Sequence, residues 1–546
     1  MLRPITVSRG DKLISLYPSD FFKVTYSISF DHPLRPVIRR ERPHGRRRPT
    51  EALHPSPDQS HAAAGERDTV SRPAWLVYAW APAMLTTPDL AARQVPVIRA
   101  VDVLVVGGGT AGAVAGIAAA REGARTLIVE QFGWLGGSQT GALVTPMMPN
   151  QLDGVPLNAG IDAEIGDRLI ARRDSGVWRD GNRGWFNPES LKHVLEQMAL
   201  EAGAELLYYT FVDEAVVDSG SLCGVVLTNK AGRAAVRAGR TVDATGDADV
   251  AARAGVPYES GDPATGLNQP FSVRFHLGNV SLERFADFLR SLGRHDVMAS
   301  AEGSDIVLIH AAMVWGKGWP LEPLFRQAVA DGVLHETDGD YFQVFSMAGR
   351  PGELACNCPR IRTDIDGTNP FHLTRAQITG REIMRRYVAF CRQYLPGCEH
   401  AYLAFSAPMV GVRESRRIRG EYYLTVEDVL EGRKFDDAVC RNNYPIDIHR
   451  DPTDEKPSLT TLPPGAYHEV PYRCLVPLGV DDLLVAGRCL SASFEAQSSV
   501  RIQPDCRALG QAAGLAAALS LRQGITPRAL DGRALREALR ARGASL

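Results

Sequence analysis

Short apolar runs alternate with small-residue helical stretches near residue 100. Val101–Val106 and Thr126–Val129 are uniformly apolar, as expected of strands that are buried on both faces. The intervening stretch Ala111–Ala120 is rich in alanine, and Gly123 follows it, which predicts a helix between the two strands. A strand, a helix and a strand in this order are typical of a parallel α/β sheet.

The next part of the chain mixes one helix with several strands. Asn187 can cap an amphipathic helix over 187–203, and Pro188 suits its first turn. Beyond it, apolar runs separated by Gly, Asp, Ser and Asn predict a meander of strands at 205–211, 215–217, 224–228 and 234–236. A further predicted strand, Thr241–Ala244, leads through a Thr–Gly–Asp turn into a helix over 248–254.

Residues 271–405 have a different pattern of apolar and polar positions, and we interpret them as an inserted α+β domain. The pattern predicts strands at 271–277 and 342–345 and helices at 282–292, 321–331 and 373–394.

The C-terminal part again combines a short apolar strand with a helix of small residues, as the stretch near residue 100 does. A strand is predicted at 482–486, a polar loop at 491–503 and a small-residue helix at 507–523. Within that helix, Gly510 and Gly514 allow close approach to a ligand or to another backbone.

Composition narrows the class of protein. The 546 residues carry a formal charge of −2 with 45% hydrophobic residues, which gives no overall bias toward nucleic acid or anionic membranes. No apolar run reaches the roughly 18–20 residues of a membrane span. The nine cysteines are odd in number and form no CxxC, which favours a reducing, cytoplasmic location and no metal site. Residues 1–95 differ from the rest of the chain and contain the basic run Arg35–Arg48. We interpret them as a solvated, disordered tail. The alternatives are a nucleic-acid-binding arm, a targeting signal, or a natural start of the protein at Met84.

Glycines punctuate the turn between the first strand and its helix. Gly107, Gly109 and Gly112 stand at GxGxxG spacing, and Glu130 follows the second strand. In such a unit the glycines permit a tight turn, backbone approach to a pyrophosphate and close helix packing. The helix N-terminus faces the phosphates, and the acid accepts from an unphosphorylated ribose. The stretch therefore predicts a dinucleotide site.

Four stretches together resemble the FAD-dependent oxidoreductases with a glutathione-reductase-like flavin domain. They are VVGGGTAGAVAGIAAAREG at 105–123, VDATGDADVAARAG at 242–255, GVRESRRIRGEYYLTVEDVLEG at 411–432, and LLVAGRCLSAS with SSVRIQPDCRALGQAAGLAAA within 483–518. The chain is also similar to the flavin portion of heterodisulfide reductase A, without the cysteine clusters of that protein. The resemblance implies FAD and an α/β, Rossmann-like FAD/NAD(P)-binding fold with an inserted α+β substrate domain.

This resemblance implies a division of the chain and a set of FAD-binding residues. The FAD-binding domain would comprise 96–270 and 406–546, with the substrate domain at 271–405. The residues around FAD would be Gly107, Gly109, Gly112, Glu130, Gly136, Gly137, Gly246, Asp247, Gly487, Arg488, Gln511, Ala512 and Ala513. The last three would begin a helix that points at the flavin pyrimidine ring. Arg501, in the stretch SSVRIQP, could face the flavin or anchor its loop. Where the family often has a histidine after its Ser–Ala–(Ser/Thr) run, this chain has Phe494.

Candidate catalytic residues lie where the chain returns from the inserted segment. His449 could move a proton while hydride moves at flavin N5, or it could be a packed histidine. Arg413 and Arg416, with Arg417 around Glu414, could clamp a substrate carboxylate or form a structural ion-pair network.

These features favour an enzyme that transfers hydride between a small organic substrate and flavin, the substrate being anionic if the arginines bind it. An electron-transfer flavin subunit that works with a separate iron–sulfur or nicotinamide partner is the alternative. A non-enzymatic scaffold that uses the basic N-terminus is a third interpretation.

Overall fold

The computed structural model describes residues 95–176, 185–293, 298–300, 307–362, 365–449 and 459–546, together with two short N-terminal strands. The chain forms two units, Met1–Thr86 and Thr87–Leu546. In the first unit, β1 (Thr6–Ser8) and β2 (Leu13–Ser15) pair antiparallel. The rest of the predicted tail over 1–95 lies outside the described residues.

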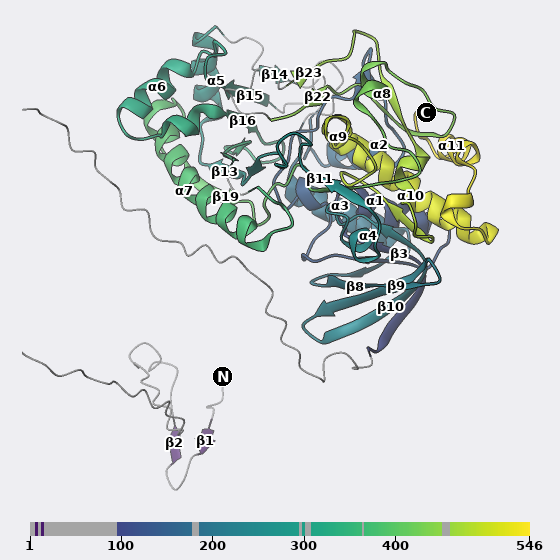
Figure 1. Ribbon diagram of the computed structural model, residues 1–546. Coiled ribbons are helices and arrows are strands. Elements are labelled where there is room, and N and C mark those ends of the chain that lie inside the picture. Colours follow the sequence, from purple (N-terminus) through teal and green to yellow (C-terminus); the bar gives the residue numbers. More distant parts are fainter. Residues whose placement is uncertain are drawn as a thin grey trace, which may run out of the picture. The chain divides into compact units, whose positions relative to one another are not determined.

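A seven-stranded sheet organises the larger unit (Figure 1), with the order β7-β4-β3-β10-β9-β8 and β25 beside β10. Its strands are β3 (Val97–Val106), β4 (Thr126–Val129), β7 (Glu205–Leu207), β8 (Phe211–Asp218), β9 (Ser221–Asn229), β10 (Gly232–Asp243) and β25 (Leu483–Val485). Strands β7, β4, β3, β10 and β25 pair in parallel, and β8, β9 and β10 form an antiparallel meander. The predicted parallel α/β sheet is confirmed.

Two details of this sheet differ from the sequence prediction. The predicted strand Thr241–Ala244 is the end of the long β10, which pairs with β9 over its first half and with β25 over Thr241–Asp243. The run that begins at Glu205 does not join the meander, because β7 pairs in parallel with β4. A change of pairing partner along one strand does not alter the pattern of apolar residues, so the sequence could not predict it.

The helices at the centre of the molecule pack tightly against each other. Helix α1 (Thr110–Arg121) joins β3 to β4 and lies against α10 (Gln503–Gln523). A Cβ atom added at Gly510 or Gly514 would lie 2.1 Å from the carbonyl oxygen of Ala111 or Ala115, so these glycines bring the two backbones into contact. Helix α3 (Pro188–Glu201) begins as predicted, with the Asn187 side chain accepting from the Glu189 amide.

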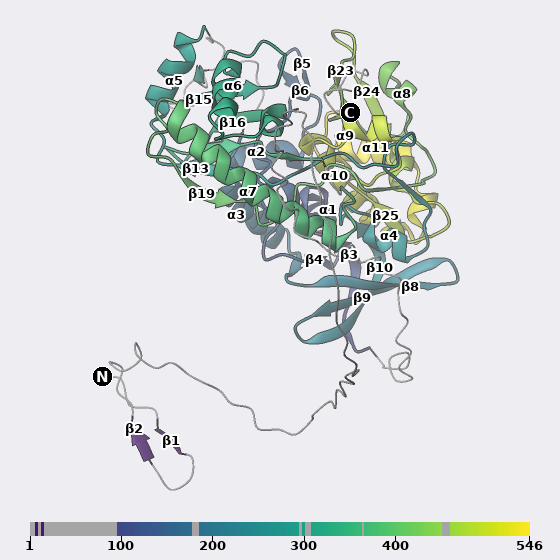
Figure 2. The same cartoon turned by 60° about the vertical axis from the view of Figure 1, so that its left-hand side comes forward.

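A second, six-stranded antiparallel sheet has the order β14-β15-β16-β17-β13-β19. Its strands are β13 (Phe275–Gly278), β14 (Met298–Ser300), β15 (Val307–Met313), β16 (Phe342–Ser346), β17 (Leu354–Cys356) and β19 (Tyr402–Ser406). Helices α5 (Leu282–Ser291), α6 (Glu322–Ala330) and α7 (Pro370–Tyr394) accompany it. In both views α5 and α6 lie at the end of the larger unit away from the β8–β10 meander, and α7 runs from that end back toward the centre of the unit (Figures 1 and 2).

Strand β16 shows how the second sheet separates its two faces. Phe342 and Val344 belong to the core formed with α5, α6 and α7. Gln343 and Phe345 alternate with them and lie on the opposite face, where Phe345 contacts Trp185. One face of the sheet is therefore covered by helices, and the other is available to line a cavity.

The C-terminal region corrects two predictions. The predicted polar loop over 491–503 contains helix α9 (Phe494–Val500), capped by Ser493. Helix α10 begins at Gln503 rather than at Arg507. The predicted strand over 271–277 is divided into β12 (Phe271–Ser272) and β13.

Smaller elements complete the described structure. The helices are α2 (Ile161–Ala171), α4 (Asp249–Arg253), α8 (Val426–Leu430) and α11 (Gly532–Arg540). The short strand pairs are β5 (Gln151–Leu152) with β6 (Val155–Pro156), β11 (Tyr258–Ser260) with β20 (Arg416–Ile418), β12 with β18 (Arg360–Ile361), β21 (Ala438–Asn442) with β24 (His468–Pro471), and β22 (Ile446–Asp447) with β23 (Leu459–Thr460). Among the described residues, no helix is long and apolar enough to cross a membrane.

Candidate active site

A cavity of about 110 Å³ opens at the carboxyl ends of β3 and β4. Gly107, Gly109, Glu130 and Gly137 line it together. The Gly109 Cα faces open space, since an added Cβ would meet nothing closer than the Gly137 Cα at 3.8 Å. At Gly112, by contrast, a Cβ would lie 1.7 Å from the Gly107 carbonyl oxygen. The second glycine of the motif thus leaves room for a ligand, and the third is required for packing.

Glu130 lines this cavity and is 5% exposed. Its carboxylate accepts from the Gly108 amide at 2.7 Å and from the Phe132 amide at 2.9 Å. Burial raises its pKa to about 7, although these two backbone bonds oppose the shift. The charge of Glu130 therefore changes near neutral pH.

Two segments distant in sequence meet beside the glycine turn. The Arg488 guanidinium donates to Asp247 at 2.7 Å and to the Ser415 hydroxyl at 3.1 Å. Gly246 faces the same guanidinium, because a Cβ added there would lie 3.1 Å from Arg488 Nε. The structure thus brings together three of the sequence-predicted residues, Gly246, Asp247 and Arg488. Two further predicted FAD-binding residues lie near the same turn. The Gly136 amide donates to the Gly108 carbonyl, and Gly487 lies against Ala111 at the start of α1.

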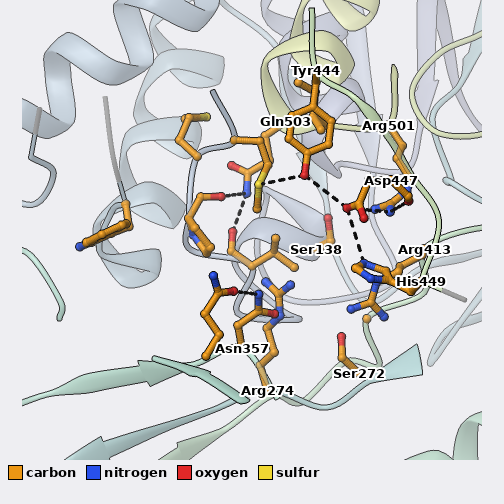
Figure 3. Close-up of a pocket in the computed structure, with 18 of the residues that line it drawn as sticks. Ser138, Ser272, Arg274, Asn357, Arg413, Tyr444, Asp447, His449, Arg501 and Gln503 are labelled. Atoms are coloured by element: carbon orange, nitrogen blue, oxygen red, sulfur yellow. Dashed lines mark hydrogen bonds and ion pairs between the residues drawn. The ribbon is translucent and has the colours of Figure 1, made fainter. Parts of the chain in front are cut away.

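A larger cavity, of about 410 Å³, is bounded by the second sheet, the loop after Gly137 and the start of α10 (Figure 3). Gln503, the first residue of α10, donates to the Val144 carbonyl at 2.6 Å and fixes that loop. The polar residues of the lining are Ser138, Ser272, Arg274, His310, Tyr341, Gln343, Asn357, Arg413, Tyr444, Asp447, His449, Arg488, Arg501 and Gln503. Most of them come from segments that the sequence analysis did not single out.

His449 and Arg413 lie together in this cavity, and Figure 3 shows their side chains side by side. His449 Nε2 is 3.7 Å from an Asp447 carboxylate oxygen, which is also 3.7 Å from the Arg501 guanidinium. Burial, reinforced by surrounding guanidinium groups that include Arg360 and Arg413, holds the pKa of His449 well below its usual range. The imidazole is therefore uncharged at neutral pH, and its proton affinity is low unless negative charge is added nearby.

Arg416 and Arg417 lie elsewhere. Arg416 donates to the Asp247 carbonyl at 2.6 Å and to Asp249 at 2.5 Å, and it is not among the residues that line the large cavity. Arg417 is buried in an ion pair with Glu414, with 3.0 Å between Arg417 Nε and Glu414 Oε1. The predicted arginine cluster thus separates into one cavity residue and two that hold the surrounding loops.

The predicted start of the helix at 511–513 is wrong. Gln511, Ala512 and Ala513 do not begin α10, because they lie two turns inside it and are almost fully buried. The Gln511 side chain accepts from the Ile161 amide at 3.0 Å and so joins α10 to α2. The residues at the start of the helix that line the cavity are Ile502 and Gln503. The proline and acid that follow them are the sequence signal that could have located this start.

The cysteines are not arranged around either cavity. Eight of the nine are buried and unpaired, and Cys223 is exposed. Within the described ranges, no group of three or more His, Cys, Asp or Glu side chains is placed to hold a metal ion.

Comparison with known proteins decides the family. The sequence pattern of the family described as FAD dependent oxidoreductase matches residues 102–539. The chain belongs to the FAD-dependent oxidoreductase family. Two thiamine thiazole synthases are each 33% identical to it. The match to the protein of Aeropyrum pernix extends over 128 residues and covers 23% of this chain and 43% of that protein. The match to the protein of Methanococcus aeolicus extends over 165 residues and covers 28% of this chain and 57% of that protein. The chain thus spans about half the length of these relatives.

Solved structures match the chain at low identity and with low TM-scores. A geranylgeranyl bacteriochlorophyll reductase-like protein of Thermoplasma acidophilum is 13% identical with a TM-score of 0.38, and the match covers 81% of this chain and 84% of that one. GidA of Aquifex aeolicus is 14% identical with a TM-score of 0.41, over 79% and 65%.

The residues present fit the FAD of this family. Helix α1 begins at Thr110 with Gly109 as N-cap and no side-chain cap, so its first amide groups are free of side-chain acceptors and can face a pyrophosphate. The open space at Gly109 admits the ligand, and the Glu130 carboxylate can accept from ribose hydroxyls. The adenosine half would thus lie along the smaller cavity and the flavin in the larger one.

FAD affinity is expected to rise with pH through about pH 7 and then level off. Only the ionised Glu130 carboxylate accepts from both ribose hydroxyls, so a proton on this group, whose pKa burial raises to about 7, competes with FAD. Fluorescence titration of the apoprotein with FAD measures the affinity across this range. Glu130→Gln should bind FAD more weakly above about pH 7 and lose the pH dependence; an unchanged pH profile in this variant would contradict the assignment.

Proposed function

We propose that this FAD-dependent oxidoreductase transfers hydride between a small anionic organic substrate and flavin N5 inside the larger cavity. The charge of the cavity lining carries the proposal. Arg274, Arg413, Arg488 and Arg501 line it, and Asp447 is the one acidic residue among the described residues of the lining. Arg488 is already paired with Asp247, which leaves three guanidinium groups and one carboxylate in the lining. An anionic substrate would supply the missing negative charge.

Each side chain then has a distinct role. Arg413 is 8% exposed and is held by a hydrogen bond to the Pro270 carbonyl, so its guanidinium is already oriented for an anion. The neutral His449 accepts the proton that leaves the substrate. Bound FAD supplies the two-electron acceptor. The N-terminus of α10, with Ile502 and Gln503 at the cavity wall, places positive helix-dipole charge there, which favours developing negative charge.

An anaerobic reduction screen tests this proposal. The purified holoprotein is mixed with matched anionic and neutral compounds, and loss of the oxidised-flavin absorbance is followed. Reduction by one class of anions, with turnover by the isolated chain, is the expected result. Reduction only in the presence of a separate iron–sulfur or nicotinamide partner would favour an electron-transfer role instead. Reduction by neutral compounds alone would overturn the anionic substrate.

Arg413→Gln should raise the substrate concentration that gives the half-maximal rate of flavin reduction by about 10- to 100-fold, the scale of one lost hydrogen bond to a charged group. The limiting rate should change less, because the guanidinium binds the substrate equally in the ground state and in the transition state. Arg416→Gln is the matched comparison. Since Arg416 holds Asp247 and Asp249, it should weaken FAD retention instead. Equal effects of the two variants on the substrate concentration would contradict this division of roles.

A further inference from the structure

Among the side chains that line the larger cavity, Arg274 and Asn357 are nearly fully buried and carry polar atoms that no described residue satisfies. Arg274, between β12 and β13, is 6% exposed, and its Nε and Nη1 atoms have no hydrogen-bond partner in the described part of the chain. Asn357, which follows β17, is 8% exposed, and its Oδ1 atom likewise has none. Buried polar atoms are rarely left unpaired, because an unmade hydrogen bond costs the full desolvation of the group.

Asn357 belongs to a hydrogen-bond network that ends at His310. Its amide nitrogen donates to Gln343 Oε1 at 2.6 Å and to the Tyr341 hydroxyl at 3.2 Å. Gln343 Oε1 also accepts from the Tyr341 hydroxyl, while the Gln343 amide nitrogen is 2.8 Å from His310 Nε2. Turning the Asn357 amide over would set its oxygen against Gln343 Oε1, and two acceptors would repel each other. With His310 Nε2 as the acceptor from Gln343, Asn357 presents an acceptor to the cavity.

Arg274 and Asn357 enter the cavity from the same side, whereas Gln503 and the start of α10 lie on the other (Figure 3). The ligand that meets them must present an acceptor to the guanidinium and a donor to Asn357 Oδ1. We propose that the substrate is a hydroxylated carboxylate, with Arg274 binding its carboxylate and Asn357 selecting its hydroxyl group. This inference rests on the proposed function, because it names the class of the anion that the cavity takes.

The charge of the cavity distinguishes a hydroxyl from an ammonium donor. Arg274 lies within the field of Arg360 and Arg501, and burial together with these groups lowers its pKa to about 10. A further positive charge in this environment would be repelled, so an amino acid is a poorer ligand than the corresponding hydroxy acid. The aromatic wall formed by Trp185 and Phe345, with ring centroids 4.8 Å apart, is available to the apolar part of the substrate.

Two matched series of ligands test the inference on the holoprotein. Malate, succinate and aspartate differ in one substituent, and so do mandelate, phenylacetate and phenylglycine. Binding is measured by the change in flavin absorbance and by the shift in unfolding temperature. The hydroxy acid of at least one series should bind about 10- to 100-fold more tightly than its deoxy and amino counterparts, because the deoxy compound leaves Asn357 Oδ1 unpaired.

Variants assign the preference to the residue. Asn357→Leu should bind the hydroxy and deoxy acids equally. Arg274→Gln should weaken all carboxylates and leave the preference unchanged. Retained FAD absorbance reports the fold of each variant. If Asn357→Leu instead alters the flavin spectrum or FAD retention without added ligand, Asn357 binds the cofactor and the inference is wrong.

The other outcomes separate the two proposals. Equal binding of hydroxy and deoxy acids by the wild-type protein would overturn the hydroxyl selection and leave the anionic substrate standing. Failure of every carboxylate to bind would overturn both.

Discussion

Gly109→Val is expected to abolish FAD binding while the protein still folds. The Gly109 backbone has φ −70°, which any residue can adopt, so valine brings no strain at that angle. An added Cβ would stand 3.8 Å from the Gly137 Cα and 3.9 Å from the Ala244 carbonyl oxygen, ordinary contact distances. The further methyl groups would extend into the smaller cavity, where the pyrophosphate must approach the helix N-terminus. The FAD absorbance of the purified variant and its affinity on titration with FAD measure the effect.

Gly112→Ala provides the contrast that makes this result specific. Its Cβ would lie 1.7 Å from the Gly107 carbonyl oxygen, so the turn itself must shift and the fold should be destabilised. Gly109→Val should instead show the circular dichroism and cooperative unfolding of the wild-type apoprotein and lack only the stabilisation that bound FAD adds. A Gly109→Val protein that retains FAD at wild-type occupancy would show that the ligand does not approach this glycine.

Local patterns were sufficient to predict the nucleotide-binding half of the fold. The strand at Val101–Val106, its glycine turn and the helix after it are specified by neighbouring residues, and so is the cap of α3 at Asn187. Each of these signals acts within one or two turns of chain. They therefore need no knowledge of what lies across the molecule.

The start of α10 and the whole of α9 were missed for a different reason. The residues Gln497, Ser498 and Ser499 of α9 are polar and yet completely buried, so the polar pattern predicted a loop. Hydrogen bonds inside the fold offset part of the cost of burying them: Gln497 donates to the carbonyls of Arg413 and Arg488, and Ser499 donates to that of Tyr444. Burial of polar groups through tertiary hydrogen bonds is invisible to periodicity.

The larger cavity could be predicted only in part. His449 and Arg413 were recognisable as candidates because they lie where the chain returns from the second sheet. Arg274 and Asn357 lie on irregular segments after short strands, and only the fold places them in one cavity. The sequence also could not distinguish Arg413 from Arg416, three residues away, although one lines the cavity and the other binds Asp249.

His449→Ala is expected to slow flavin reduction by about 100-fold or more while FAD stays bound, the usual scale for the loss of a general base. Two features of the site support this. His449 is placed beside the arginines that would hold an anion, and its depressed pKa keeps it neutral before the substrate binds. The negative charge of a bound substrate opposes the field of those arginines, so binding raises the proton affinity of the imidazole at the step where it is needed.

Stopped-flow reduction with a substrate from the anaerobic screen measures the effect. A base should be replaceable, so added imidazole should restore part of the rate of His449→Ala and none of the rate of Arg413→Gln. Asp447→Asn is the positioning control: the carboxylate lies 3.7 Å from His449 Nε2, and its loss should reduce the rate less than loss of the imidazole does. If His449→Ala reduces its flavin as fast as the wild-type protein, the histidine only packs the cavity wall. The proton must then leave through another group of the lining, of which the Tyr444 hydroxyl, 3.3 Å from the same Asp447, is the next to test.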